Sequence, residues 1–193
     1  MLFTQFEFIF IFLPTAFAGY FVIGSWFDNP NARLVWLAAA SLFFYGYWSI
    51  LFLPVITLSI CGNYLAALSI AGQPDGPGRR LRFALMVAAN LAVLGFYKYT
   101  NFGIDIVNAV TRSHIGHAAI VLPLGISFFS FTQIAYLTDV YRGEVIERNF
   151  AKYTLFVTFF PHLVAGPILH HREMMPQFGS DASRRMSTQN IAL

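Results

Sequence analysis

The 193-residue sequence is 57% hydrophobic and only 11% charged, and it contains 22 phenylalanines. A soluble domain carries roughly 25% charged residues, so this composition excludes an ordinary water-soluble fold and indicates an all-α, polytopic integral membrane protein. The single cysteine, Cys61, excludes an internal disulfide, and the net charge of +3 is better explained by membrane orientation than by a nucleic-acid partner.

The first apolar segment covers residues 8–27 and contains no charged residue. About 20 helical residues at about 1.5 Å each cross a hydrocarbon core of roughly 30 Å, so this segment predicts one membrane span. The sequence Ala16-Phe17-Ala18 imitates a signal-peptide cleavage site, but Glu7 precedes it and no Lys or Arg does. We therefore expect a retained first helix.

A second charge-free stretch, residues 34–74, would form a helix about twice as long as the hydrocarbon core is thick. It must therefore fold back. Residues 45–49 suit the turn, because Gly46 permits a bend and Tyr and Trp favour the membrane interface. Pro54 then falls in the first turn of the next helix, where its missing N–H costs little. The stretch predicts a hairpin of two spans, followed by a Gly- and Pro-rich loop over residues 72–80.

Two further spans are expected. The fourth covers residues 83–97, after which Lys98 can extend to the interface and a polar segment continues to His117. Residues 118–138 are charge-free again and predict a fifth span that ends at Asp139.

Residues 153–169 form a sixth apolar segment of a different kind. Pro161, Gly166 and Pro167 interrupt it, and His162 lies within it. Interrupted backbone at membrane depth is tolerated only where protein or a water-filled cavity satisfies its polar groups. The segment predicts a re-entrant or kinked helix that lines a cavity, so the expected fold is about five transmembrane helices plus a broken or re-entrant sixth segment.

The basic residues give this fold a direction, because cytoplasmic loops are enriched in Lys and Arg. With the N-terminus outside, only Lys98 and Arg112 fall on the outer side. The inner side then holds Arg33, Arg79, Arg80, Arg82, Arg142, Arg148 and Lys152. A re-entrant sixth segment adds Arg172, Arg184 and Arg185 to the inner side, whereas a complete span places them outside. The charge pattern favours the re-entrant form.

An ionisable residue inside a membrane is a functional candidate, because burying it without a partner is costly. His162 could act as a general base on a hydroxyl acceptor or line a substrate path. It could equally bond a backbone carbonyl that Pro161 or Pro167 leaves free. We take Pro161, His162, Gly166 and Pro167 together as candidates for lining a cavity or substrate path.

Three polar residues near the fifth span complete the candidate set. Asp139 and Arg142 form either an interfacial ion pair, which is worth little at a surface, or an anchor beside a cytoplasmic substrate entrance. Gln133 lies inside the span, where polar side chains more often bond between helices than bind substrate. A metal site is not expected, because His170 and His171 are adjacent and lack a second ligand pair at a suitable spacing.

Several motifs of the sequence resemble those of the membrane-bound O-acyltransferase family. In chain order they are SLFFY (41–45), NYL (63–65), GFYKYTNF (95–102), LPLGISFF (122–129), YLTDVYRG (136–143), FFPHLVAGPI (159–168) and MPQF (175–178). They cover nearly the whole chain and are most similar to the bacterial branch that contains the alginate O-acetyltransferase membrane subunit. Residues 1–193 resemble the N-terminal part of one membrane-embedded acyltransferase domain.

The resemblance implies an O-acyltransferase of polysaccharide or alginate biosynthesis in the bacterial plasma (inner) membrane. Such an enzyme moves an acyl group, here expected to be acetyl, from a cytoplasmic donor to a hydroxyl of an exported polysaccharide. No bound cofactor is implied; acetyl-CoA or an acyl carrier would serve as co-substrate. The implied partners are membrane lipid, the acyl donor and extracytoplasmic proteins of the acetyltransferase pathway, with no nucleic acid.

One departure limits the transfer of catalytic roles. The family's histidine that is taken as catalytic lies well downstream of the AGP motif, and His170 and His171 are too close to that motif to be its counterpart. We therefore expect a fragment whose catalytic histidine lies beyond Leu193 and which is inactive alone. Two alternatives stay open: D-alanyl transfer to teichoic acid, and a non-catalytic membrane scaffold or transporter subunit.

Overall fold

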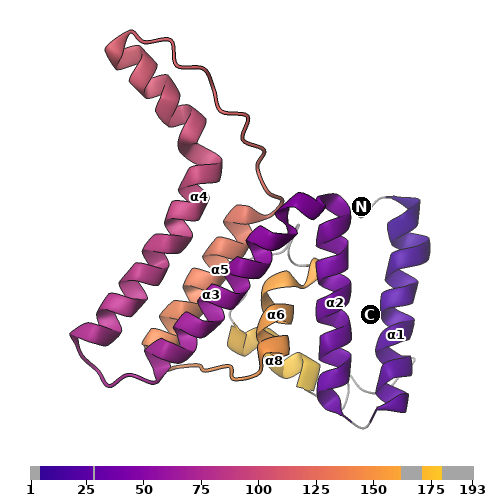
Figure 1. Ribbon diagram of the computed structural model, residues 1–193. Coiled ribbons are helices and arrows are strands. Elements are labelled where there is room, and N and C mark those ends of the chain that lie inside the picture. The colour runs from indigo at the N-terminus through magenta and orange to yellow at the C-terminus, as the bar shows by residue number, and fades with distance from the viewer. Residues whose placement is uncertain (1–4, 28, 162–170, 180–193) are drawn as a thin grey trace.

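The computed structural model describes residues 5–27, 29–161 and 171–179, and each secondary-structure element in these ranges is a helix (Figure 1). A short π-helical turn, Phe8–Phe12, continues into α1. The other elements are α1 (Leu13–Trp26), α2 (Pro30–Trp48), a 3-10 turn (Ile50–Phe52), α3 (Leu53–Ala71), α4 (Pro77–Thr111), α5 (Ile126–Tyr141), α6 (Phe150–Thr158) and α8 (His171–Gly179). The all-α prediction is confirmed for the described part of the chain.

Within the described ranges, three helices are long and apolar enough to cross a membrane. They are Phe8–Trp26, Ile50–Ala71 and Pro77–Thr111. Helix α2 packs between α1 and α6, while α3 and α5 pack side by side between α6 and α4 (Figure 1). The predicted first span therefore stands almost as expected, since the helix from Phe8 ends one residue before the predicted boundary.

The predicted turn of the hairpin is confirmed, although only the second of its two helices is among the candidate spans of the described ranges. Helix α2 ends at Trp48, and Ser49 adopts an extended conformation with φ −158° and ψ 108°. Pro54 lies in the first turn of α3, where a proline removes no intrahelical hydrogen bond. At the other end of α2, the side chain of Asn29 accepts a hydrogen bond of 2.9 Å from the N–H of Asn31 and caps the helix.

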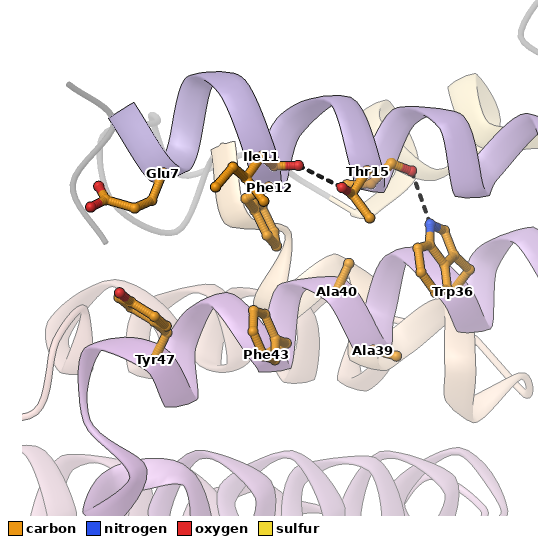
Figure 2. Close-up of a pocket in the computed structure, with 10 residues that line it drawn as sticks. Glu7, Ile11, Phe12, Thr15, Trp36, Ala39, Ala40, Phe43 and Tyr47 are labelled. Carbon is orange, nitrogen blue, oxygen red and sulfur yellow. Dashed lines mark hydrogen bonds between the residues drawn. The ribbon is translucent and has the colours of Figure 1, made fainter. Parts of the chain in front are cut away.

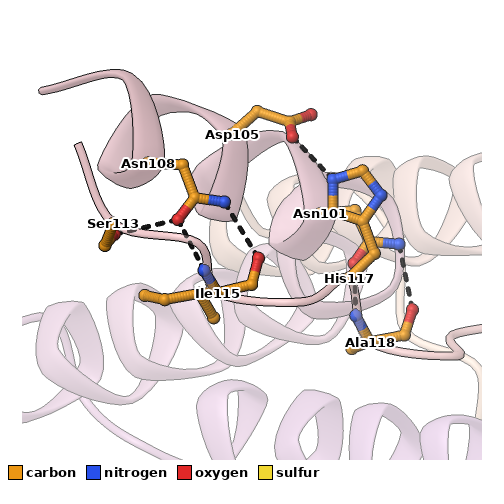
Figure 3. Close-up of polar contacts among 7 residues, drawn as sticks. All are labelled: Asn101, Asp105, Asn108, Ser113, Ile115, His117 and Ala118. Atoms are coloured by element: carbon orange, nitrogen blue, oxygen red, sulfur yellow. Dashed lines mark hydrogen bonds and ion pairs between the residues drawn. The ribbon is translucent and has the colours of Figure 1, made fainter. Parts of the chain in front are cut away.

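The predicted fourth span was too short at both ends, because α4 runs over 35 residues from Pro77 to Thr111. Beyond Lys98, the polar side chains lie on one helix face at spacings of three and four residues. Asn101 and Asn108 each exchange two hydrogen bonds with the returning loop, to Ala118 and Ile115 (Figure 3). The first part of the polar segment expected after the fourth span therefore belongs to α4, which extends to Thr111 and holds the returning loop.

The predicted fifth span began too early and ended too early. Helix α5 starts at Ile126, preceded by Gly125 with φ +66°, a left-handed conformation that suits glycine. Residues 118–125 have no regular secondary structure, in keeping with the bonds that tie Ala118 to α4. Asp139 lies inside α5 and is only 4% exposed, so it does not end the helix.

The two largest clusters of buried side chains in the described part of the chain hold the helices together. The larger one joins α3, α5 and α6 and includes Ile56, Phe129 and Phe156, none more than 1% exposed. The smaller one is aromatic and joins the start of the first helix to α2: Phe12 packs 5.5 Å from Phe44, measured between ring centroids. Burial of such side chains supplies most of the stability of the helix contacts.

Candidate functional site

Gln133, a fully buried polar side chain of α5, lies at the centre of a hydrogen-bonded network. Its Nε2 donates to the hydroxyl of Ser59 on α3 at 2.9 Å, and its Oε1 accepts from the hydroxyl of Tyr153 on α6 at 3.2 Å. Gln133 and Tyr153 are fully buried. Gln133 therefore bonds between helices, as polar residues inside a span usually do.

A buried amide pair joins α3 to α4. The side chains of Asn63 and Asn90 donate to each other's carbonyl oxygens at 3.1 and 2.7 Å. Each also donates to its own helix, Asn63 to the carbonyl of Ser59 and Asn90 to that of Met86. The polar network thus runs through α3, α4, α5 and α6, and its amides satisfy each other in an apolar interior, where an unpaired amide would be costly.

A second polar group lies where α8 meets the loop between α5 and α6. His171, the first residue of α8, is 6% exposed and lies between the rings of Tyr136 and Phe156, with centroid distances of 5.3 and 5.0 Å. Its Nε2 is 3.5 Å from a carboxylate oxygen of Glu147, and the N–H of Glu147 donates to the hydroxyl of Tyr136 at 2.9 Å. This arrangement fixes the start of α8 against α5.

The carboxyl of Glu147 has a perturbed pKa. Burial by itself raises that pKa, but the contact with His171, the N–H of Asn149 and the nearby charge of Lys152 outweigh burial and lower it below the ordinary value. The N–H of Asn149 donates to the carboxylate at 2.8 Å. Glu147 is therefore held ionised, which suits a carboxylate that positions an imidazole.

Arg79 forms a third polar group at the same end of the helices. Its guanidinium donates to the carbonyl oxygens of Val140 and Tyr141, at 3.3 and 2.8 Å, and lies over the ring of Tyr141. It therefore caps the last turn of α5, where carbonyl groups lack helical partners. A small cavity of about 270 Å³ lies beside it, bordered by Glu144 and Gly143.

The structure places part of the predicted candidate set. Asp139 is buried whereas Arg142 is exposed, and the backbone carbonyl of Asp139 accepts the N–H of Glu144 at 2.9 Å. Helix α6 ends at Thr158, Phe159 has a ψ of 108°, and Pro161 is exposed. The chain is thus interrupted just before Pro161, as expected. The remaining candidates, His162, Gly166 and Pro167, lie outside the described residues.

Sequence reasoning missed two of these groups. Glu147 and Tyr136 were not singled out, and His171 was weighed only as a metal ligand. Arg79 was used only for orientation. Among the described residues, no group of three or more His, Cys, Asp or Glu side chains could hold a metal ion. What the described polar groups do is tie helices together at one end and through the middle of the bundle.

Comparison with known proteins shows which proteins this chain is related to. The chain is 41% identical, over its whole length, to a peptidoglycan O-acetyltransferase of Helicobacter pylori. It is 38% and 36% identical, over 92% and 93% of its length, to probable alginate O-acetylases of Azotobacter vinelandii and Pseudomonas putida. The chain is a homologue of these bacterial O-acetylases. The resemblance to the membrane-bound O-acyltransferase family is therefore confirmed.

The homology covers only part of each relative. The alignments span 41%, 36% and 37% of the H. pylori, A. vinelandii and P. putida proteins, so the chain covers about two fifths of their length. No protein-family profile and no solved structure matches the chain. With its candidate spans, this homologue of O-acetyltransferases is a multi-pass membrane protein.

Proposed function

We propose that this chain is part of a membrane O-acyltransferase that transfers an acetyl group from a cytoplasmic donor to a hydroxyl of an exported polysaccharide. The observation that carries the proposal is the identity of 36–41% to proteins named for O-acetylation of peptidoglycan or alginate. Both acceptors are glycans, which offer sugar hydroxyls. Acetyl-CoA or an acyl carrier is the proposed donor, and extracytoplasmic proteins of the pathway are the proposed partners.

The proposed topology has five spans and a re-entrant sixth segment in the bacterial plasma membrane, with the N-terminus outside. Contacts between loops support it by gathering the basic segments at one end of the bundle. Arg79 bonds the end of α5, and the hydroxyl of Tyr64 donates to the carbonyl of Arg148 at 2.5 Å. Asn149 donates to Asn31 at 2.8 Å, which brings the start of α2 to the same end. A cluster of basic loops marks a cytoplasmic side.

The re-entrant form has its own support. The chain leaves this end along α6, and α8 begins beside the loop that precedes α6, with His171 3.5 Å from Glu147 and Arg172 3.4 Å from Glu144. Helix α6 has only nine residues, about 13 Å, which is less than half of a roughly 30 Å core. A segment that enters and returns on one side fits both facts.

The topology predicts the location of fused reporters. A reporter joined after Gly78 is expected to lie in the cytoplasm, and a reporter joined near Ser113 is expected to lie on the extracytoplasmic side. Paired alkaline phosphatase and green fluorescent protein fusions measure this. The opposite pattern at the two positions would contradict the proposed orientation.

The function is tested by the acetate content of exported glycans. Deleting the gene that encodes this chain, in the bacterium that carries it, is expected to remove most ester-linked acetate from one exported polysaccharide or from peptidoglycan, and the intact gene should restore it. Mild alkaline release followed by chromatography measures the acetate. The 193 residues expressed alone are expected not to restore it, because they span about two fifths of the relatives' length.

Other outcomes of the same experiment identify the alternatives. Loss of ester-linked D-alanine with unchanged acetate would replace acetyl transfer by D-alanyl transfer. Unchanged amounts of both esters would favour a non-catalytic scaffold or transporter subunit.

A further inference from the structure

Helices α1 and α2 approach closely at one end and separate toward the other. At the close end, the indole N–H of Trp36 donates to the carbonyl of Ala16 at 2.9 Å, and a Cβ added to Gly19 would lie 2.4 Å from the Trp36 ring. Farther along, Arg33 donates to the carbonyl of Gly24 at 2.9 Å, near the end of α1. These contacts fix one end of the helix pair.

The other half of the pair encloses a groove of about 580 Å³ (Figure 2). Apolar side chains from both helices line it, among them Ile11, Phe12, Ala39 and Phe43. Its two uncharged polar groups near the closed end are already satisfied by backbone carbonyls, since the Thr15 hydroxyl donates to Ile11 at 2.6 Å and the Trp36 indole to Ala16. The groove therefore offers hydrocarbon to its occupant along its length.

The open end of the groove is polar. Glu7 and Tyr47 lie there, Glu7 just before the first helix and Tyr47 near the end of α2 (Figure 2). Both side chains are exposed. Among the described residues that line the groove, Glu7 carries the only carboxyl, so a cation is the complementary partner at this end.

The length of the groove matches one membrane leaflet. Trp36 and Tyr47 are eleven positions apart on α2, about 16 Å along a helix axis, and one leaflet contributes about half of a roughly 30 Å hydrocarbon core. One of its walls, Phe8–Trp26, is apolar enough to cross a membrane. A hydrocarbon chain that starts at the polar end reaches the Trp36 end at mid-membrane.

We propose that the groove between α1 and α2 binds one acyl chain of a phospholipid whose head group carries an ammonium, with Glu7 recognising that ammonium. Phosphatidylethanolamine has this chemistry: two acyl chains and a primary ammonium. The groove selects the chain by its shape and the head group by the charge at its mouth. Nothing in this assignment depends on the acyl-transfer reaction.

The chain-binding part is tested by filling the groove. Ala39 is exposed and lines it, so Ala39→Trp blocks it; the matched control Ala92→Trp places the same side chain on the exposed face of α4, away from the groove. The protein is purified from membranes in mild detergent, and the retained phospholipid is counted by native mass spectrometry. Because the indole would occupy the space of the acyl chain and remove its packing contacts, the A39W variant is expected to retain about tenfold less phospholipid than the A92W variant.

A photoreactive fatty acyl phospholipid gives a second measurement that does not depend on a variant. Labelled peptides are expected from both walls of the groove, around Ile11 and Ala39. Equal retention in the A39W and A92W variants would overturn the proposal. So would labelling no stronger at the groove than at Leu58, an exposed residue of α3, or cross-links from one copy of the chain to another across the groove.

The head-group part is tested with Glu7→Gln. In nanodiscs that contain equal amounts of phosphatidylethanolamine and phosphatidylglycerol, the wild-type protein is expected to retain the ethanolamine lipid in several-fold excess after transfer to detergent. The E7Q variant should retain as much lipid in total but lose the preference. An unchanged preference in the E7Q variant, or none in the wild type, would overturn the role of Glu7.

Discussion

Replacing Gly19 by alanine is expected to destabilise the protein by about 1–3 kcal/mol, because the new methyl group would overpack the contact between α1 and α2. The added Cβ would lie 2.4 Å from Cε2 and Cζ2 of Trp36. The indole cannot move aside freely, since its N–H is bonded to the carbonyl of Ala16. Relief of the clash would therefore cost either that hydrogen bond or the close approach of the two helices.

A glycine without neighbours supplies the control. Gly95 lies within α4, and a Cβ added there meets nothing within 4 Å. Because alanine is a better helix former than glycine by about 1 kcal/mol, Gly95→Ala should leave stability unchanged or raise it. Thermal unfolding of the purified protein in detergent compares the two variants. A G19A variant as stable as the G95A variant would mean that α1 and α2 are farther apart than described.

The clash can also be removed from the other side. Combining Gly19→Ala with Trp36→Leu takes away the ring that the methyl group would meet. The double variant is expected to lose less than the sum of the two single variants, since contacting residues couple in this way. Additive losses would contradict a direct contact between the two positions.

The helices that could be predicted well are those whose ends are determined by residues within or next to the helix. A charge-free run long enough for one span gave the first helix, and Gly46 with Pro54 located the hairpin within about three residues. These features act locally: a proline tolerates only certain helix positions, and an apolar run of a given length either crosses a bilayer or folds back.

The errors arose where tertiary contacts decide the structure. Asparagine suits both a loop and an exposed helix face. Only the hydrogen bonds of Asn101 and Asn108 to Ala118 and Ile115 show that these two residues belong to a helix. The bonds to Ala118 also explain why the fifth helix does not begin at residue 118, where the charge-free stretch predicted its start. A single charged residue is also a weak signal for the end of a helix, since α5 continues past Asp139 to Tyr141.

For the candidate site, the kind of interaction could be predicted from the sequence better than the residues that take part in it. Gln133 was expected to bond between helices, and its partners Ser59 and Tyr153 confirm that expectation. Those partners are far away in the sequence, as are Glu147 and His171, so no spacing rule brings them together. Only the packing of α3, α5, α6 and α8 makes them neighbours.

The buried amide pair offers the second large effect. Asn63→Leu is expected to cost about 1–3 kcal/mol, because the amide of Asn90 would lose its partner in a site where only 4% of the residue is exposed. Thr57→Val is the matched control on the same helix: its hydroxyl is exposed and donates only to the carbonyl of Leu53, so its loss should change stability by less than about 0.5 kcal/mol.

The double variant separates the pairing from the cost of an unpaired group. With Asn63→Leu and Asn90→Leu together, no buried amide remains unsatisfied, and stability should recover to near the wild-type value, since replacing both partners of a buried bond can be nearly neutral. Unfolding of the four proteins in mixed micelles measures the coupling. If the double variant lost as much stability as both single variants together, the two amides would be bonding to other groups. If the same double substitution in the full-length protein left it stable but unable to acetylate glycan, the network would have a part in the reaction.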